Sequence, residues 1–132
     1  MRKLFVNLAV RDLKKSMDFF SRLGFTFNPK FTDDKAACMV VNDNAFCMLL
    51  TEPFFRSFAT KEPCDTSRNT EALLALSCGS RAEVDEMVNK AVAAGGAHAK
   101  EPMDHDFMYG WSFLDLDGHH WEVMWMNETA VQ

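Results

Sequence analysis

The side chains best suited to chemistry lie in one strongly patterned stretch near the end of the chain, residues 109–126 (YGWSFLDLDGHHWEVMWM). Two aromatic-rich segments flank an Asp-Gly pair at 117–118, which is typical of a tight turn between antiparallel strands. Alternation along the second strand places Glu122 on the same face as His120, Met124 and Met126. A carboxylate on an apolar face either meets solvent or lies in a partly dry cavity, where it needs a partner. In a cavity, Glu122 could act as a general acid or base, or anchor a cationic ligand group.

Other donors in the second half could join Glu122 to rebuild a site. The adjacent His119 and His120 should point to opposite faces of a strand. His98 is a further candidate, and Asp104-His105-Asp106 belongs to a predicted loop, where a solvated role is more typical than metal binding. Cys47 either lines a cavity or is a small buried hydrophobe. The sequence contains no Ser-His-Asp pattern, phosphate-binding loop or H-E-x-x-H motif.

Composition indicates an ordinary globular protein of 132 residues, with 48% hydrophobic and 25% charged residues. A net charge of −5 and the lack of a basic stripe argue against a nucleic-acid partner. The chain opens directly into a predicted strand without a signal sequence, and no apolar run is long enough to cross a membrane. Four cysteines without a C-x-x-C pair favour reduced thiols, and together these features predict a cytoplasmic protein.

The first half has the pattern of one strand, one helix and three further strands. Apolar alternation predicts the first strand over residues 3–10. Asp12 is a good N-cap for the following helix, which Gly24 should end. The remaining elements are short strands at 25–27, 36–41 and 46–51, and a short helix or aromatic loop at 53–58.

The same order returns after a polar segment, residues 60–70, which we interpret as a linker. Ser80 and Glu83 form a capping box at the start of the second long helix. Gly95-Gly96 should end this helix. The other predicted elements are a strand at 71–77, a short strand at 97–100, a loop at 101–108 and the closing hairpin.

The repeated order indicates an internal duplication within a single domain, residues 1–132, with repeat one over 1–59 and repeat two over 71–127. The predicted fold is α+β, with two βαβββ repeats. Each repeat would form a curled mixed sheet with one helix outside. Two such sheets side by side would enclose a concave cavity, a natural place for a ligand.

Both halves carry residues found together in one known superfamily. They are residues 5–13 (FVNLAVRDL), Ser16, Phe19-Phe20 and 23–25 (LGF) in the first half, and Phe113, Asp115, 117–119 (DGH) and Trp121-Glu122 in the second. With these residues the chain resembles the vicinal oxygen chelate superfamily. That superfamily includes glyoxalase I, extradiol dioxygenases, fosfomycin-resistance enzymes and bleomycin-resistance proteins.

The resemblance implies metal ligands on the first and fourth strands of each repeat, usually His, Glu or Gln. By position these would fall at Phe5, near Leu49 with an uncertainty of about one residue, near Leu73 and at Glu122. Three of the four positions are therefore apolar and supply no donor to a divalent cation. We predict no resident metal or other cofactor, while a divalent metal stays open if other side chains rebuild the site.

The cavity implied by the resemblance would be an apolar pocket around one acid. Asn7 and Ser77 would offer neutral hydrogen bonds, and Tyr109 and Trp111 would close one end. The predicted ligand-binding residues are Phe5, Asn7, Leu49, Leu73, Tyr109, Trp111 and Glu122.

Two functions remain open, and whether the protein is an enzyme is undecided at this point. The first is a protein that binds a small apolar or cationic molecule without the usual catalytic metal, as bleomycin-resistance relatives do. The second is a glyoxalase-like lyase, isomerase or dioxygenase, with Glu122 as catalytic residue and a rebuilt metal site. Relatives commonly dimerise, and exposed strand edges in so apolar a sheet invite aggregation, so we expect a homodimer.

Overall fold

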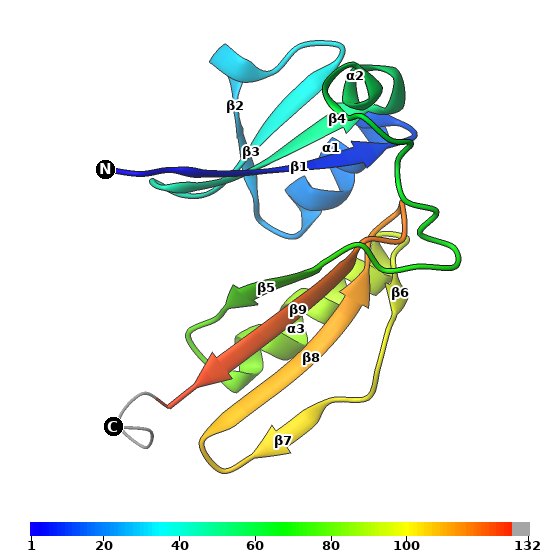
Figure 1. The fold of residues 1–132 in the computed structure, drawn as a ribbon. Coiled ribbons are helices and arrows are strands. Elements are labelled where there is room, and N and C mark those ends of the chain that lie inside the picture. Colours follow the sequence, from blue (N-terminus) through cyan, green and yellow to red (C-terminus); the bar gives the residue numbers. More distant parts are fainter. Residues whose placement is uncertain (128–132) are drawn as a thin grey trace. The chain divides into compact units, whose positions relative to one another are not determined.

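The computed structural model describes residues 1–127, and the chain divides into two compact units, Met1–Cys64 and Asp65–Gln132. The boundary falls inside the segment predicted to be a linker, and each unit contains one mixed sheet and at least one α-helix. The predicted α+β class is confirmed. Figure 1 shows the elements of both units.

The first unit follows the predicted order of elements. They are β1 (Leu4–Val10), α1 (Leu13–Arg22), β2 (Thr26–Asn28), the 3-10 helix η1 (Pro29–Phe31), β3 (Ala36–Asn42), β4 (Ala45–Thr51) and α2 (Glu52–Phe58). The strands form a sheet of order β1-β4-β3-β2, in which β1 and β4 are parallel and the other pairs antiparallel. The segment left open as a helix or a loop is the helix α2, and Pro53 lies in its first turn, where a missing N–H costs nothing.

Helix α1 covers one face of this sheet. The Asp12 side chain accepts a hydrogen bond from the backbone N–H of Lys15 (3.1 Å), and Gly24 takes a positive φ of 102° just after the helix, so both predicted ends are confirmed. Phe19 and Phe20 are buried, with ring centroids 4.9 Å apart. The side chains buried on the helix-covered side of the sheet include Leu8, Val10, Met39, Cys47 and Leu49.

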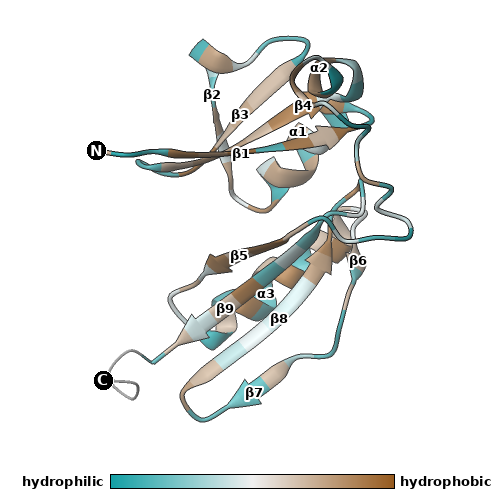
Figure 2. Ribbon diagram, in the orientation of Figure 1, coloured by the Kyte–Doolittle hydropathy of each residue, from teal (hydrophilic) through white to brown (hydrophobic). Residues whose placement is uncertain are grey.

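The second unit repeats this plan with additional strands. It contains β5 (Leu73–Ser77), α3 (Arg81–Ala93), β6 (Ala97–His98), β7 (Met103–His105), β8 (Met108–Leu114) and β9 (His120–Met126). The sheet order is β5-β9-β8-β6, with β7 also paired to β8. Strands β5 and β9 are parallel and the other pairs antiparallel. Strand β5 is hydrophobic along most of its length (Figure 2).

Helix α3 begins at the predicted capping box, with one difference. The Ser80 hydroxyl accepts from the N–H of Glu83 (3.1 Å), but the Glu83 carboxylate accepts from the N–H of Gly79 (2.8 Å), one residue before the expected donor. The helix packs on β8 and β9 (Figure 1). Val84 and Val88 of the helix are fully buried with Phe113, Trp121 and Val123 of the sheet.

The loop predicted at 101–108 is partly wrong, because it contains the strand β7. Met103 and His105 are register partners of Gly110 and Met108 on β8. This strand is three residues long and exposed throughout, so it has no apolar alternation for a sequence pattern to detect. Backbone pairing to β8 is what makes it a strand. Within the described residues, no helix is both long enough and apolar enough to span a membrane.

Candidate functional site

The turn between β8 and β9 is organised by the buried carboxylate of Asp115. One of its oxygens accepts from the N–H groups of Asp117 (2.9 Å) and His119 (3.0 Å), and the other accepts from the indole N–H of Trp121 (3.0 Å). Burial raises the pKa of Asp115, although these donors and nearby His119 oppose that shift. Gly118 supplies the positive φ of 81° that the turn requires. Together these bonds fix the start of β9.

The segment that precedes β5 is attached to the same turn. His119 is buried, and its Nδ1 lies 3.0 Å from a carboxylate oxygen of Glu71. The Thr66 hydroxyl donates a short hydrogen bond to the carbonyl of Asp117. His119 therefore stabilises the contact between the turn and the segment that precedes β5.

The face of the second sheet opposite α3 carries the polar groups of interest. Ala75, Glu122 and Ser112 are register partners across β5, β9 and β8, so they share this face. Leu73, His120 and Met124 extend it along the strands. The buried Trp121 and Val123 lie on the other face, so the predicted alternation along β9 is confirmed.

Glu122 has a partner on its own strand. The Nε2 atom of His120 and a carboxylate oxygen of Glu122 form a short hydrogen bond. The side chain of His120 is 12% exposed and that of Glu122 is 32% exposed. The pair is therefore mostly buried, and Glu122 is still accessible to a ligand. The alternation along the strand placed His120 and Glu122 on one face, as the structure has them, but it did not predict that the two side chains bond to each other.

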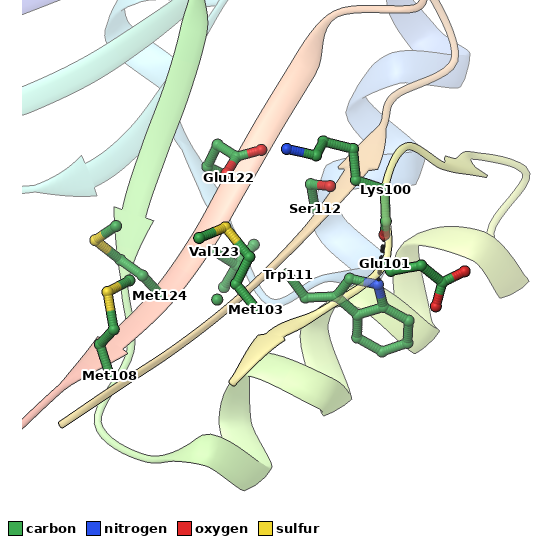
Figure 3. A pocket seen from close by; sticks show the side chains of 10 residues that line it. Lys100, Glu101, Met103, Met108, Trp111, Ser112, Glu122, Val123 and Met124 are labelled. Carbon is green, nitrogen blue, oxygen red and sulfur yellow. Dashed lines mark hydrogen bonds between the residues drawn. The ribbon is translucent and has the colours of Figure 1, made fainter. Parts of the chain in front are cut away.

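A small hollow of about 40 Å³ lies beside Glu122. In Figure 3 the ammonium of Lys100 and the carboxylate of Glu122 point toward one another near the hydroxyl of Ser112. The residues that line the hollow are Lys100, Glu101, Met103, Met108, Gly110, Trp111, Ser112, Glu122, Val123 and Met124. Whole-ligand cavities measure roughly 300–1,000 Å³, so this hollow has room for one chemical group only.

The structure places Tyr109 away from Glu122. Its hydroxyl donates to the carboxylate of Asp85 on α3 (2.5 Å), so Tyr109 lies on the helix-covered side. The hydrogen bond to Asp85 and burial raise the pKa of Tyr109 to about 12. The guanidinium of Arg81 lies 5.4 Å from the Tyr109 ring and 5.2 Å from the Trp125 ring. Tyr109 therefore docks α3 on the sheet, and this placement corrects its predicted position at the mouth of a cavity.

Trp111 lies at the edge of the hollow. Its indole N–H donates to the carbonyl of Lys100 (3.0 Å), and its ring stacks on His98 at 5.4 Å. Trp111 therefore lines the hollow, but its register partner is Val123, so it lies on the face of the sheet opposite Glu122 and its predicted place beside that acid is corrected.

In the first unit, Phe5 and Asn7 lie on the face opposite α1. The Phe5 ring stacks on Phe46 at 4.9 Å, and the Asn7 amide donates to the carbonyl of Phe5 (3.2 Å). Leu49 is fully buried on the helix-covered face, so its predicted place beside Phe5 is corrected. The register partner of Asn7 is Met48, which takes that place. A shift of one residue in a strand reverses the face, which is why the prediction missed it.

The side chains present do not fit the metal site that the resemblance implies. Phe5 and Leu73 carry only hydrocarbon, and Met48 offers a weakly donating thioether. His120 and Glu122 are two good donors, but within residues 1–127 no three His, Cys, Asp or Glu side chains gather into a group able to hold a metal ion. We therefore assign no step to a metal.

Comparison with known proteins agrees with this fold. Residues 4–123 match the family model of the Glyoxalase/Bleomycin resistance protein/Dioxygenase superfamily. A hypothetical protein from S. aureus is 32% identical, with a TM-score of 0.78 over 94% of this chain and 93% of its own. No curated protein matches the chain.

Two further solved structures show the fold alone, because their identity to this chain is low. A glyoxalase-related enzyme from Fulvimarina pelagi has a TM-score of 0.77 at 21% identity, over 95% of this chain and 88% of its own. The fosfomycin resistance protein FosX from Mesorhizobium loti has a TM-score of 0.68 at 11% identity, over 99% of this chain and 95% of its own.

Proposed function

The chain belongs to the glyoxalase/bleomycin resistance protein/dioxygenase superfamily, and from this premise we propose that it binds a small molecule through Glu122. The ligand has an apolar body and a cationic or N–H-bearing head, and it needs no resident metal. The observation that carries this proposal is the His120–Glu122 pair on the open face of β9, beside Met124 and the exposed Leu73.

The chemistry of this face supports such a ligand. An ionised carboxylate only accepts hydrogen bonds, so a cation or an N–H group is its natural partner. Methionine side chains adapt to apolar bodies of different shape because they are unbranched and polarizable. His120 holds the Glu122 carboxylate in place before a ligand arrives, which reduces the cost of ordering it on binding.

Replacement of Glu122 tests this function directly. We expect aromatic amines such as benzylamine and benzyltrimethylammonium to raise the melting temperature of the wild type. Glu122→Gln should weaken their binding by roughly tenfold or more in calorimetric titrations, because benzylamine loses a charge-assisted hydrogen bond and benzyltrimethylammonium loses the attraction of the opposite charge. Glu86→Gln is the matched control, since Glu86 is exposed on α3 and pairs with Lys90. Unchanged binding by Glu122→Gln, or no binding across the panel, would refute the proposal.

The alternative is a glyoxalase-like lyase, isomerase or dioxygenase, and the same His120–Glu122 pair favours it. A carboxylate hydrogen-bonded to an imidazole can move a proton to or from a substrate atom. Turnover of thiol adducts, lost in both Glu122→Gln and His120→Gln, would select this function. Tight uptake of one divalent metal together with such turnover would replace the binding function.

We also propose that the protein is a cytoplasmic homodimer. Strands β1 and β5 lie at the ends of their sheets, and Leu4 and Leu73 on them are 61% and 64% exposed. Burial of such edges against a second copy would remove a site of aggregation. The four cysteine thiols suit a reducing compartment.

A further inference from the structure

The hollow beside Glu122 combines groups of different hydrogen-bonding ability, and we propose that it takes a carboxamide group of the ligand. This inference rests on the proposed binding function and names the head group. It starts from Ser112, which is only 2% exposed and whose hydroxyl has no hydrogen-bond partner among the described residues. A buried polar group without a partner is unfavourable, so such a group usually meets a ligand or a water.

The polar groups around the hollow differ in what they can do. The Glu122 carboxylate only accepts hydrogen bonds, the Lys100 ammonium only donates them, and the Ser112 hydroxyl does both. Figure 3 shows the Lys100 and Glu122 side chains reaching toward one another from opposite sides of Ser112, while the Glu101 carboxylate points away. A group placed here meets an acceptor on one side and a donor on the other.

A carboxamide matches this arrangement because it carries N–H donors and a carbonyl acceptor on one planar carbon. Its N–H would donate to Glu122, and its carbonyl would accept from Lys100 and Ser112. An ammonium group can still bind Glu122, but the like charge of Lys100 weakens its binding and Lys100 gains no acceptor; a carboxylate is repelled by Glu122. A ketone leaves Glu122 without a donor.

The size and surroundings of the hollow agree with this group. A volume of about 40 Å³ corresponds to on the order of three water-sized positions, which suits the carbon, oxygen and nitrogen of a carboxamide. Met103, Met108 and Met124 line the hollow around the polar groups. Apolar walls lower the local polarity and so strengthen the hydrogen bonds formed beside them.

Four probes with the same ring test the proposal: benzamide, benzylamine, benzoate and acetophenone. We expect NMR titrations of the full chain to show benzamide binding at least roughly fivefold more tightly than each of the others, as one or two extra hydrogen bonds would give. Ser112→Ala and Lys100→Met should each weaken the binding of benzamide and of acetophenone, because both probes present a carbonyl to these donors, and should reduce the preference for benzamide over benzylamine. Lys90→Met, which removes a lysine of α3, is the matched control.

The possible results separate the inference from the function on which it rests. Equal binding of all four probes, tighter binding of benzylamine, or benzamide binding that Ser112→Ala leaves unchanged would overturn the head-group assignment and leave small-molecule binding intact. Binding of none of the probes by the folded wild type would overturn both. Because Ser112→Ala deletes an unpartnered hydroxyl, its melting temperature should equal or exceed that of the wild type, which confirms that the variant is folded.

Discussion

Asp115 and Glu122 are carboxylates of the same hairpin with opposite surroundings. Asp115 is buried and all its bonds in the turn come from N–H groups of the chain, so it serves the structure. Glu122 is partly exposed and bonded to His120, so its remaining acceptor capacity faces the open side of the sheet. The sequence pattern identified Glu122, but it did not identify the network of Asp115, because an alternation pattern does not reveal which buried polar groups find partners.

Replacing Asp115 by Asn should lower the free energy of unfolding by about 1–3 kcal/mol, because one of its N–H donors loses its acceptor. Burial raises the pKa of Asp115 above the ordinary value of 3.8, so the Asp115 carboxyl holds its proton more firmly in the folded chain than in the unfolded chain. The stability advantage of the wild type over Asp115→Asn should therefore be largest at acidic pH and decline as pH rises through the folded-state pKa. Urea unfolding of the wild type and of Asp115→Asn over a pH series measures this difference in the free energy of unfolding. A stability advantage of the wild type that grows with pH would contradict a raised pKa for Asp115.

At the scale of elements, the ends of the helices were the most predictable feature. Asp12, Ser80, Gly24 and Gly95 act through local backbone geometry, which the nearby sequence determines. Strand β7 was not predictable, because its pairing to β8 depends on residues that carry no apolar pattern. The face of Leu49 was missed because the strand register was uncertain by one residue.

Tyr109 links the helix α3 to the strand β8, so its hydroxyl should matter for stability. Tyr109→Phe should lower the free energy of unfolding by about 1 kcal/mol near neutral pH, since the bond to Asp85 is lost. The raised pKa means that this contribution is complete below the ordinary value of 10.0 and is lost as pH rises toward about 12. Unfolding measured from neutral to alkaline pH should show the decline in the wild type and not in Tyr109→Phe. Identical curves would show that the hydroxyl contributes nothing.

At the scale of the whole molecule, the duplicated order of elements and the α+β class followed from the sequence. The candidate site could not be located in the same way, because the two units carry different side chains on corresponding faces of their sheets. The open face of the first sheet carries Phe5, Asn7 and Met48, whereas that of the second carries His120, Glu122 and Ser112. A repeat of secondary structure says nothing about which copy keeps its polar side chains.

The proposed dimer gives a prediction at this scale. Sedimentation equilibrium at micromolar concentration should give twice the monomer mass for the wild type. Leu73→Lys should shift the mass toward the monomer, because it puts a charge on an exposed strand end. Phe31→Lys is the matched control, since Phe31 is similarly exposed (63%) on η1 and should leave the mass unchanged. A monomeric wild type would refute the dimer.

The close approach of Thr66 to the hairpin turn has a consequence for how relatives are aligned. A methyl group added at Gly118 would come within 3.0 Å of the Thr66 hydroxyl and 3.1 Å of its Cβ. Positions 66 and 118 therefore behave as one coupled pair, although they are distant in the chain. A bulkier residue at this bend would have to adopt the positive φ and would need the segment at Thr66 to move by a few tenths of an ångström, so the two positions should be compared together when relatives are aligned.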